Sequence, residues 1–168
     1  HDASVARHAR HRVVIAQPHA RASELGFVGS IKTIHTAPLR EACARHVIPV
    51  LSPVGIAGRQ WYNINADDVA SEVAVHLRAE KLVLLTNVRG ILRQARDVHS
   101  LISTLSVKEA QRLMARQVIQ AGMIPKVRAC MHALRHGVRK THIIDAAIPH
   151  AMLLEMFTNT GIGTELVR

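Results

Sequence analysis

Short runs of β-branched and aliphatic residues alternate along the chain with longer segments whose apolar residues recur at helical spacing. The runs predict strands at residues 13–16, 27–33, 47–51, 82–86 and 141–144. The longer segments predict helices at residues 38–45, 67–78, 107–119, 124–135 and 151–157. The continuous apolar run at residues 82–85 is typical of a strand buried on both faces. This alternation predicts an α/β fold, a three-layer sandwich in which helices cover a mainly parallel central sheet.

Residues with helix-capping chemistry support these helix boundaries. Ser106 and Glu109 form a capping box at the start of one helix, where each side chain satisfies an otherwise unpaired amide of the first turn. Thr36 and Asn65 are suitable N-terminal caps for their helices, and Gly137 is a suitable helix stop. In such a fold we expect the functional loops at the carboxyl ends of the strands.

The composition is that of one compact folded domain. The chain has 168 residues, of which 48% are hydrophobic, and this content excludes intrinsic disorder for most of its length. Its apolar stretches are shorter than the roughly 18 residues of a membrane-spanning helix, and the sequence shows no signal peptide. Cys43 and Cys130 lie in helix-like segments, so we expect two small buried residues rather than a disulfide framework. A reducing, cytoplasmic location is therefore expected.

Positive charge exceeds negative charge, with 22 Lys and Arg against 12 Asp and Glu and a formal net charge of +10. This excess favours an anionic partner, either nucleic acid or a phosphorylated small molecule. Aromatic residues make up 2% of the chain, so stacking platforms for nucleic-acid bases are nearly absent. Residues 1–23 form a His- and Arg-rich lead that we interpret as a poorly ordered arm, followed by one domain at residues 24–168.

Polar residues gather just before the helix expected at residues 67–78. Asn63, Asn65 and Asp67 occupy alternate positions, which share one face of an extended backbone. Such a face could bind a polar ligand and hold a carboxylate close to a cation. Capping of the following helix by Asn65 or Asp67 explains the same residues equally well, and spacing alone does not decide between the two interpretations.

A second group marks the start of the helix expected at residues 124–135. Gly122 gives backbone freedom, Pro125 suits a first helical turn, and Lys126 adds a cation where the helix dipole already attracts anions. An exposed lysine without a function is the simpler interpretation of that position. The turn at residues 86–92, which contains a glycine, follows a strand at the place where doubly wound sheets bind nucleotides, although many strands end in such turns.

Several familiar signatures are absent from the sequence, including the G-x-x-x-x-G-K-[ST] phosphate loop and the G-x-G-x-x-G fingerprint. The 12 histidines include two closely spaced pairs, at residues 8 and 11 and at residues 132 and 136. Neither pair has an obvious third ligand, so we expect no protein metal site.

Taken together, several of these segments resemble, in the correct order, the C-terminal half of the N-acetylglutamate kinases. The N-acetylglutamate kinases belong to the amino acid kinases, and they phosphorylate the side-chain carboxylate of N-acetyl-L-glutamate in arginine biosynthesis. The matching segments are residues 25–29, 62–67, 84–92, 122–127, 142–145, 149–151, 155–158 and 161–164. The resemblance implies ATP and Mg²⁺ as cofactors, N-acetyl-L-glutamate as substrate, a homo-oligomeric full-length protein, and neither a nucleic-acid nor a membrane partner.

The resemblance also implies roles for individual residues in phosphoryl transfer. Lys126 would stabilise the phosphoryl group in transit, and Asp67 would orient the catalytic lysines. Asn63 would contact the acetylglutamate, and Asn65 would line the region between substrate and nucleotide. The nucleotide-binding residues would be Thr86, Asn87, Val88, Gly90, Leu92, Ile119, Gly122 and Met123.

His142, Glu155 and Gly161 match the positions with which arginine-inhibited members of the family bind their feedback ligand. A carboxylate such as that of Glu155 pairs well with a guanidinium group, so arginine is a candidate inhibitor. The first half of the family, with its glycine-rich phosphate turn and lysine, has no counterpart in the sequence, and Asn87 stands where many members have Asp. We therefore expect a nucleotide-binding half of the kinase. A non-catalytic nucleotide- or arginine-binding module is the alternative, and a nucleic-acid binder is a third hypothesis.

Overall fold

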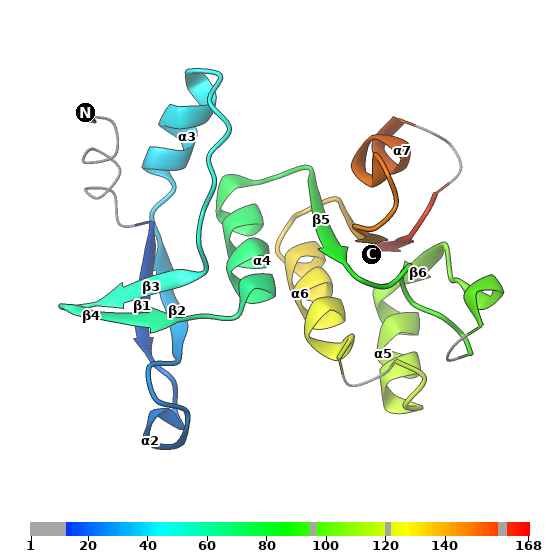
Figure 1. Ribbon diagram of the computed structural model, residues 1–168, viewed down its shortest axis with the longest axis horizontal. Helices are drawn as coiled ribbons and strands as arrows, with labels where there is room; N and C mark the ends of the chain where they lie inside the picture. The colour runs from blue at the N-terminus through cyan, green and yellow to red at the C-terminus, as the bar shows by residue number, and fades with distance from the viewer. Residues whose placement is uncertain (1–12, 95–96, 120–121, 158–160) are drawn as a thin grey trace. The chain divides into compact units, whose positions relative to one another are not determined.

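The structure is a computed structural model that describes residues 13–94, 97–119, 122–157 and 161–168 (Figure 1). The chain divides into two compact units, His1–Leu77 and Arg78–Arg168. The described strands form two four-stranded sheets, one in each unit.

Four strands form the sheet of the first unit: β1 (Val14–Pro18), β2 (Gly29–Ile34), β3 (Val54–Ala57) and β4 (Gln60–Asn63). Their order is β2-β1-β3-β4, so β1 is an inner strand. β1 pairs antiparallel with β2 and parallel with β3, and β3 pairs antiparallel with β4. The described part of the expected lead, residues 13–23, thus contributes a sheet strand and the start of a short helix.

Three helices accompany this sheet: α2 (Ala22–Leu25), α3 (Ala37–Ala44) and α4 (Ala66–Leu77). Val14 and Ala16 alternate along β1 and are both buried, because side chains two apart in a strand point to the same face. They share a core with Leu39 of α3 and Val69 of α4. This core packs α4 against β2 and places the start of α4 directly after the end of β4.

Four strands form the sheet of the second unit: β5 (Lys81–Thr86), β6 (Thr104–Ser106), β7 (Lys140–Asp145) and β8 (Thr164–Val167). In the order β5-β7-β8-β6, the β5–β7 and β6–β8 pairs are parallel and the β7–β8 pair is antiparallel. The helices of this unit are η1 (Val98–Ser100), α5 (Val107–Ala115), α6 (Ile124–Arg135) and α7 (Ala151–Phe157). α6 packs on β7, and Val127, Leu134, Ile143 and Leu166 are fully buried.

The expected α/β class is confirmed, and parallel pairing predominates in the second sheet. The strands are divided between two sheets, however, and antiparallel pairing predominates in the first. Connection length explains this difference, because parallel neighbours need a crossover of about a dozen residues or more. Only residues 58 and 59 join β3 to β4, and only residues 19–28 join β1 to β2.

Two expectations about apolar runs are wrong. Residues 47–51 form no strand, since Pro49 lacks the amide hydrogen that a ladder requires. Ile48 and Val50 on either side of it are 87% and 96% exposed. Residues 82–85 are not buried on both faces, because Leu82 and Leu84 are buried whereas Leu85 is 52% exposed. β5 lies at the edge of its sheet and packs against α6, which accounts for the single buried face.

The two cysteines are both free, and they differ in exposure. Cys130 is buried in α6 as expected, but Cys43 is exposed in the last turn of α3. The expectation for Cys43 is wrong because Leu39 is the buried residue of α3, and the last turn of this helix extends beyond the core. Within the described residues, no helix has the length and apolar character needed to cross a membrane.

Candidate functional site

The turn that follows β5 contains most of the expected nucleotide-binding residues. Thr86 ends the strand with a buried side chain, and its carbonyl oxygen accepts the Ala146 amide at 2.8 Å. Asn87 and Val88 are exposed, so the turn presents one polar and one apolar side chain to solvent. The parallel partner β7 thereby anchors the end of β5 and leaves the next residues accessible to a ligand.

Gly90 closes this turn in a backbone conformation with φ of 142°, which L side chains rarely adopt. A Cβ atom at this position would lie 2.6 Å from Thr164 Oγ1 and 3.0 Å from the Thr164 backbone nitrogen. The Thr164 hydroxyl oxygen accepts the Ile91 amide at 2.8 Å in the buried interior. Only glycine allows the turn to approach β8 this closely.

Thr164 is a positioning residue for which the sequence analysis had assigned no role. It lies 73 positions from Ile91, so no local pattern indicates the contact. The only signal in the sequence is that Thr164 lies in one of the segments that resemble the kinase family. Its side chain fixes the backbone of the turn that follows β5 from a distant strand.

The start of α6 presents a helix N-terminus with little side-chain capping. Met123 is the N-cap residue and makes no side-chain capping bond, and Pro125 lies in the first turn as expected. The first amide groups of a helix have no partner within the helix and attract anions. Lys126 is half-buried in the same turn, and the following Val127 is fully buried and fixes the helix to the core.

Gly122 has a different environment from Gly90. The described glycines with positive φ are Gly26, Gly58, Gly90 and Gly137, so Gly122 does not use the left-handed region. Among the residues that the structure describes, and apart from its chain neighbours, no atom lies within 4 Å of the place where its Cβ would be. The backbone at Gly122 therefore borders open space before α6, while Ile119, on the other side of the undescribed residues 120–121, is buried.

The polar residues at the start of α4 do not form the extended row that alternate spacing suggested. β4 ends at Asn63, and the helix begins at residue 66. Asn65 Oδ1 accepts the Asp67 amide at 2.9 Å and the Asp68 amide at 3.1 Å, so the capping interpretation is confirmed for Asn65. Asn63 is exposed at the strand end, and Asp67 lies half-buried in the first helical turn.

A buried polar cluster brings together His142, Glu155 and Gly161. His142 Nδ1 lies 2.8 Å from Glu155 Oε1, and these side chains are only 6% and 4% exposed. Glu155 Oε2 accepts the Ile162 amide at 2.9 Å, and a Cβ on Gly161 would lie 3.9 Å from the same oxygen. His142 Nε2 is buried without a hydrogen-bond partner among the described residues. The three residues that the resemblance grouped are thus spatial neighbours.

The expected site residues divide between the two units. Asn63, Asn65 and Asp67 belong to the first unit, whereas Lys126, the nucleotide-binding residues and the His142 cluster belong to the second. Among the residues that the structure describes, no group of three or more His, Cys, Asp or Glu could hold a metal ion.

Comparison with known proteins provides an independent view of the chain. Residues 5–145 match the amino acid kinase family. The chain is 49% identical over 145 residues to an acetylglutamate kinase from Desulforamulus reducens, covering 86% of this chain and 50% of that protein. It is 42% identical over 168 residues to an acetylglutamate kinase from Symbiobacterium thermophilum, covering 99% of this chain and 57% of that protein. The chain spans about half the length of the curated relatives it matches.

Several solved structures superpose on most of this chain. An N-acetylglutamate synthase from Neisseria gonorrhoeae, in complex with coenzyme A and N-acetyl-glutamate, superposes with a TM-score of 0.85 at 31% identity, over 94% of this chain and 37% of that chain. The same enzyme in complex with coenzyme A and L-arginine gives a TM-score of 0.83, with the same identity and coverage. A carbamate kinase from Giardia lamblia bound to AMP-PNP gives 0.71 at 16% identity, over 92% of this chain and 59% of that chain, a similarity of fold alone.

Proposed function

The chain belongs to the amino acid kinase family, and from this premise we propose that residues 24–168 are the nucleotide-binding half of an acetylglutamate kinase. The reaction is the transfer of a phosphoryl group from ATP to the side-chain carboxylate of N-acetyl-L-glutamate. The observation that carries the proposal is the pairing, in one unit, of the closed glycine turn at Gly90 with an uncapped helix start that bears Lys126. The similarity to acetylglutamate kinases supports this choice of substrate over others in the family.

The geometry of the second unit suits a nucleotide with its phosphates at the start of α6. No described residue outside its chain neighbours crowds Gly122, and the positive end of the α6 dipole attracts the phosphates. Thr86, Asn87, Val88, Gly90 and Leu92 would hold the remainder of the nucleotide, together with Ile119 and Met123. Mg²⁺ would bind with the phosphates and neutralise part of their charge.

Phosphoryl transfer depends mainly on positioning and on neutralisation of charge, which defines the proposed roles. Lys126 stabilises the charge on the transferred group, and Asp67 orients the lysines that do so. Asn63 binds the acetylglutamate. Asn65 Oδ1 already accepts two helix amides, so its part in substrate binding falls to its Nδ2 group.

The His142 cluster is the proposed site of arginine inhibition. Its support is the buried Glu155 carboxylate, which suits a guanidinium group, together with the related synthase that was solved with L-arginine. Glu155 is held by His142 and by the Ile162 amide, so arginine would have to replace or share one of these contacts. The full-length protein would be a homo-oligomer of the cytoplasm, and two free cysteines agree with a reducing compartment.

Calorimetry with MgATP on the 168-residue chain tests nucleotide binding directly. Lys126→Ala should abolish most of the binding contributed by the phosphates, whereas Lys32→Ala, an exposed lysine of β2, serves as the matched control and should leave it unchanged. An absence of heat with MgATP in the unmodified chain would overturn the proposal.

A steady-state assay with ATP and N-acetyl-L-glutamate then separates a kinase from a binding module. In an active preparation, Lys126→Ala should lower kcat by about 100-fold or more, the usual cost of removing one transition-state charge partner. ATP binding without turnover would instead support the non-catalytic nucleotide-binding module.

A further inference from the structure

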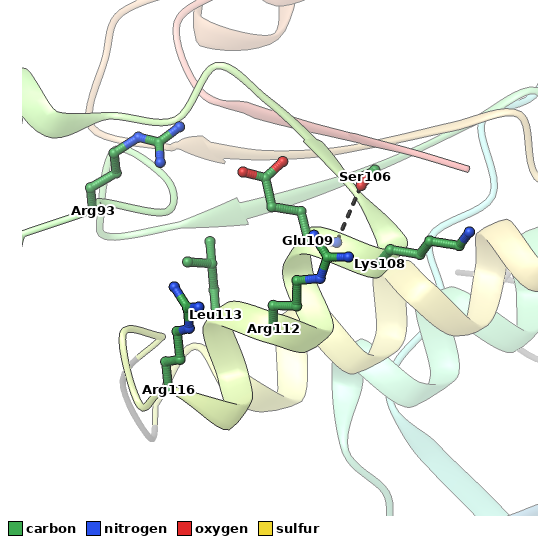
Figure 2. Close-up of a pocket in the computed structure, with 7 residues that line it drawn as sticks. All are labelled: Arg93, Ser106, Lys108, Glu109, Arg112, Leu113 and Arg116. Atoms are coloured by element: carbon green, nitrogen blue, oxygen red, sulfur yellow. Dashed lines mark hydrogen bonds between the residues drawn. The ribbon is translucent and has the colours of Figure 1, made fainter.

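A concave site lies on α5. The pocket has a volume of about 380 Å³ and is lined by Arg93, Ser106, Lys108, Glu109, Arg112, Leu113 and Arg116 (Figure 2). None of the proposed nucleotide-binding residues lines it. Its chemistry is therefore independent of the function proposed above.

Helix geometry explains why most of these side chains meet. Glu109, Arg112 and Arg116 are spaced by three and four positions along α5 and its C-cap, so they lie on one face of the helix. Ser106 caps α5 by accepting the Glu109 amide at 3.2 Å, which fixes the first turn beneath the pocket. Figure 2 shows Glu109, Leu113 and Arg116 on the side of the helix that faces Arg93, whereas the guanidinium of Arg112 extends toward Lys108, whose own side chain points away from the group.

Arg93 reaches the pocket from a different part of the chain. It follows the nucleotide turn, and its backbone amide donates to the Ser100 carbonyl at 2.9 Å. Leu92, the residue before Arg93, forms an antiparallel β-bridge with Leu101 that holds the same segment. The position of Arg93 opposite α5 is therefore set by backbone contacts rather than by its own charge.

Positive charge dominates the pocket, and the carboxylates that the structure describes do not neutralise it. Three arginines and one lysine line it, against the single carboxylate of Glu109. In the part of the chain that the structure describes, no ion pair joins any of these four cations to a carboxylate. Like charges four apart on a helix, such as Arg112 and Arg116, destabilise it, so this arrangement costs stability that an external anion would recover.

The chemistry of the lining restricts the anion. Arginine presents a planar fork of donors that suits phosphate oxygens, and three such forks can contact more than one phosphate group. The volume lies within the range of small-molecule sites, roughly 300–1,000 Å³. No aromatic side chain lines the pocket on which a base could stack, which argues against a nucleic acid as the ligand. We propose that this pocket binds a small molecule with two or more phosphate groups.

Glu109 adds a selectivity feature to this site. Its carboxylate accepts hydrogen bonds and repels anions, so it favours a ligand that has a hydroxyl or amine donor next to its phosphates. Inorganic tripolyphosphate is nevertheless a suitable probe, because it tests the phosphate recognition by the arginines alone.

The test is a calorimetric titration of the 168-residue chain with tripolyphosphate. The variant R93Q/R112Q/R116Q should weaken binding at least about tenfold, since it removes three charge-assisted contacts. R45Q/R59Q/R139Q removes three exposed arginines outside the pocket and the same net charge, and it should weaken binding less than about twofold. Circular dichroism of each variant establishes that the fold is retained.

Two further arms separate this site from its alternatives. In Lys126→Ala tripolyphosphate should lose any binding at the nucleotide site and still bind at the α5 pocket, whereas complete loss of binding in this variant together with retention in R93Q/R112Q/R116Q would assign all binding to the nucleotide site and overturn the proposal. Citrate should bind more weakly than tripolyphosphate. Tighter binding of citrate, or equal weakening by the two triple variants, would also overturn it, the latter by showing a general charge effect.

Discussion

Two buried threonines of the second sheet provide a controlled test of how the proposed nucleotide turn is held. Thr164 and Thr141 are both fully buried, and both lie in paired strands of the second sheet. Thr164 Oγ1 accepts the Ile91 amide at 2.8 Å, whereas Thr141 Oγ1 has no hydrogen-bond partner among the described residues. The same substitution, threonine to valine, therefore removes a hydrogen bond at one position and an unsatisfied hydroxyl at the other.

The expected magnitudes follow from the cost of an unpaired buried polar group. Thr164→Val leaves the Ile91 amide without an acceptor in a residue that is 2% exposed, which should cost about 1–3 kcal/mol of unfolding free energy. Thr141→Val replaces an unpaired hydroxyl with a methyl group of similar size, so it should be neutral or stabilising. For a chain of this length, roughly 2–4 °C of Tm accompanies each kcal/mol, which predicts a decrease of about 2–12 °C for Thr164→Val alone.

Thermal unfolding followed by circular dichroism measures both variants under the same conditions. Thr164→Ser is the conservative control, because it keeps the hydroxyl and loses only one methyl group, at a cost of about 1 kcal/mol. The reasoning is refuted if Thr141→Val destabilises the chain as much as Thr164→Val does. It is also refuted if Thr164→Ser is the most damaging of the three.

Three other substitutions test separate contacts. Gly90→Ala should cost about 2–4 kcal/mol in denaturant unfolding, since a Cβ would meet Thr164 Oγ1 at 2.6 Å at a φ of 142°; an unchanged midpoint would contradict the assigned turn geometry. Glu155→Ala should lower the unfolding free energy by about 3 kcal/mol, because it leaves His142 and the Ile162 amide without their buried acceptor. Glu155→Gln should lower it less, and equal losses in the two variants would show that these contacts contribute little. Asn65→Ala should lose about 1 kcal/mol of capping energy, while Asn65→Asp should retain most of it; the same measurement separates them.

Helices were predicted well from the sequence because their signals are local. The helix expected at residues 124–135 has the observed bounds of α6, and the helices at residues 67–78 and 151–157 agree with α4 and α7 within one residue. Capping residues and helical periodicity act within a few positions of each other, so the chain itself carries this information. The helix expected at residues 107–119 was too long, since α5 ends at Ala115 and Gln117 takes a positive φ.

Short strands were predicted poorly because their own sequences carry little signal. β3, β4, β6 and β8 have three or four residues each and lack a long apolar run. Only pairing with a distant strand gives β6 and β8 their extended conformation, since they pair with each other across about 60 positions. Residues 47–51 show the opposite error, because an apolar run around Pro49 indicates a strand that the backbone of proline does not allow.

The candidate site shows the same division between local and distant information. Spacing left Asn65 undecided between a cap and a ligand residue, and the hydrogen bonds to two helix amides settle its capping role. The grouping of His142, Glu155 and Gly161 came from the family resemblance, and their contacts agree with it. The contact of Thr164 with Ile91 required the folded sheet, and so did the placement of Arg93 in one pocket with the arginines of α5.

The proposed arginine site and the proposed nucleotide turn of the second unit are joined by one short segment of backbone. Ile162 donates its amide to Glu155 in the proposed arginine site, and Thr164, two residues later, accepts the Ile91 amide in the proposed nucleotide turn. Gly163 between them lies so close to the Ile143 carbonyl oxygen that no side chain fits there, which fixes the segment against β7. A ligand that displaces Glu155 would therefore act on the same backbone that holds the nucleotide turn.

This link predicts coupling between arginine and ATP that depends on the Thr164 hydroxyl. By reciprocity of binding, arginine should change the affinity for MgATP by the same factor as MgATP changes the affinity for arginine. Thr164→Val should bring that factor toward one, while Thr164→Ser should preserve it, because only the serine keeps the acceptor for the Ile91 amide. Calorimetric titrations of MgATP with and without saturating arginine measure the factor in each variant. If arginine binds at Glu155, a coupling factor of equal size in Thr164→Val and in the unmodified chain would show that the Thr164 hydroxyl does not transmit the coupling.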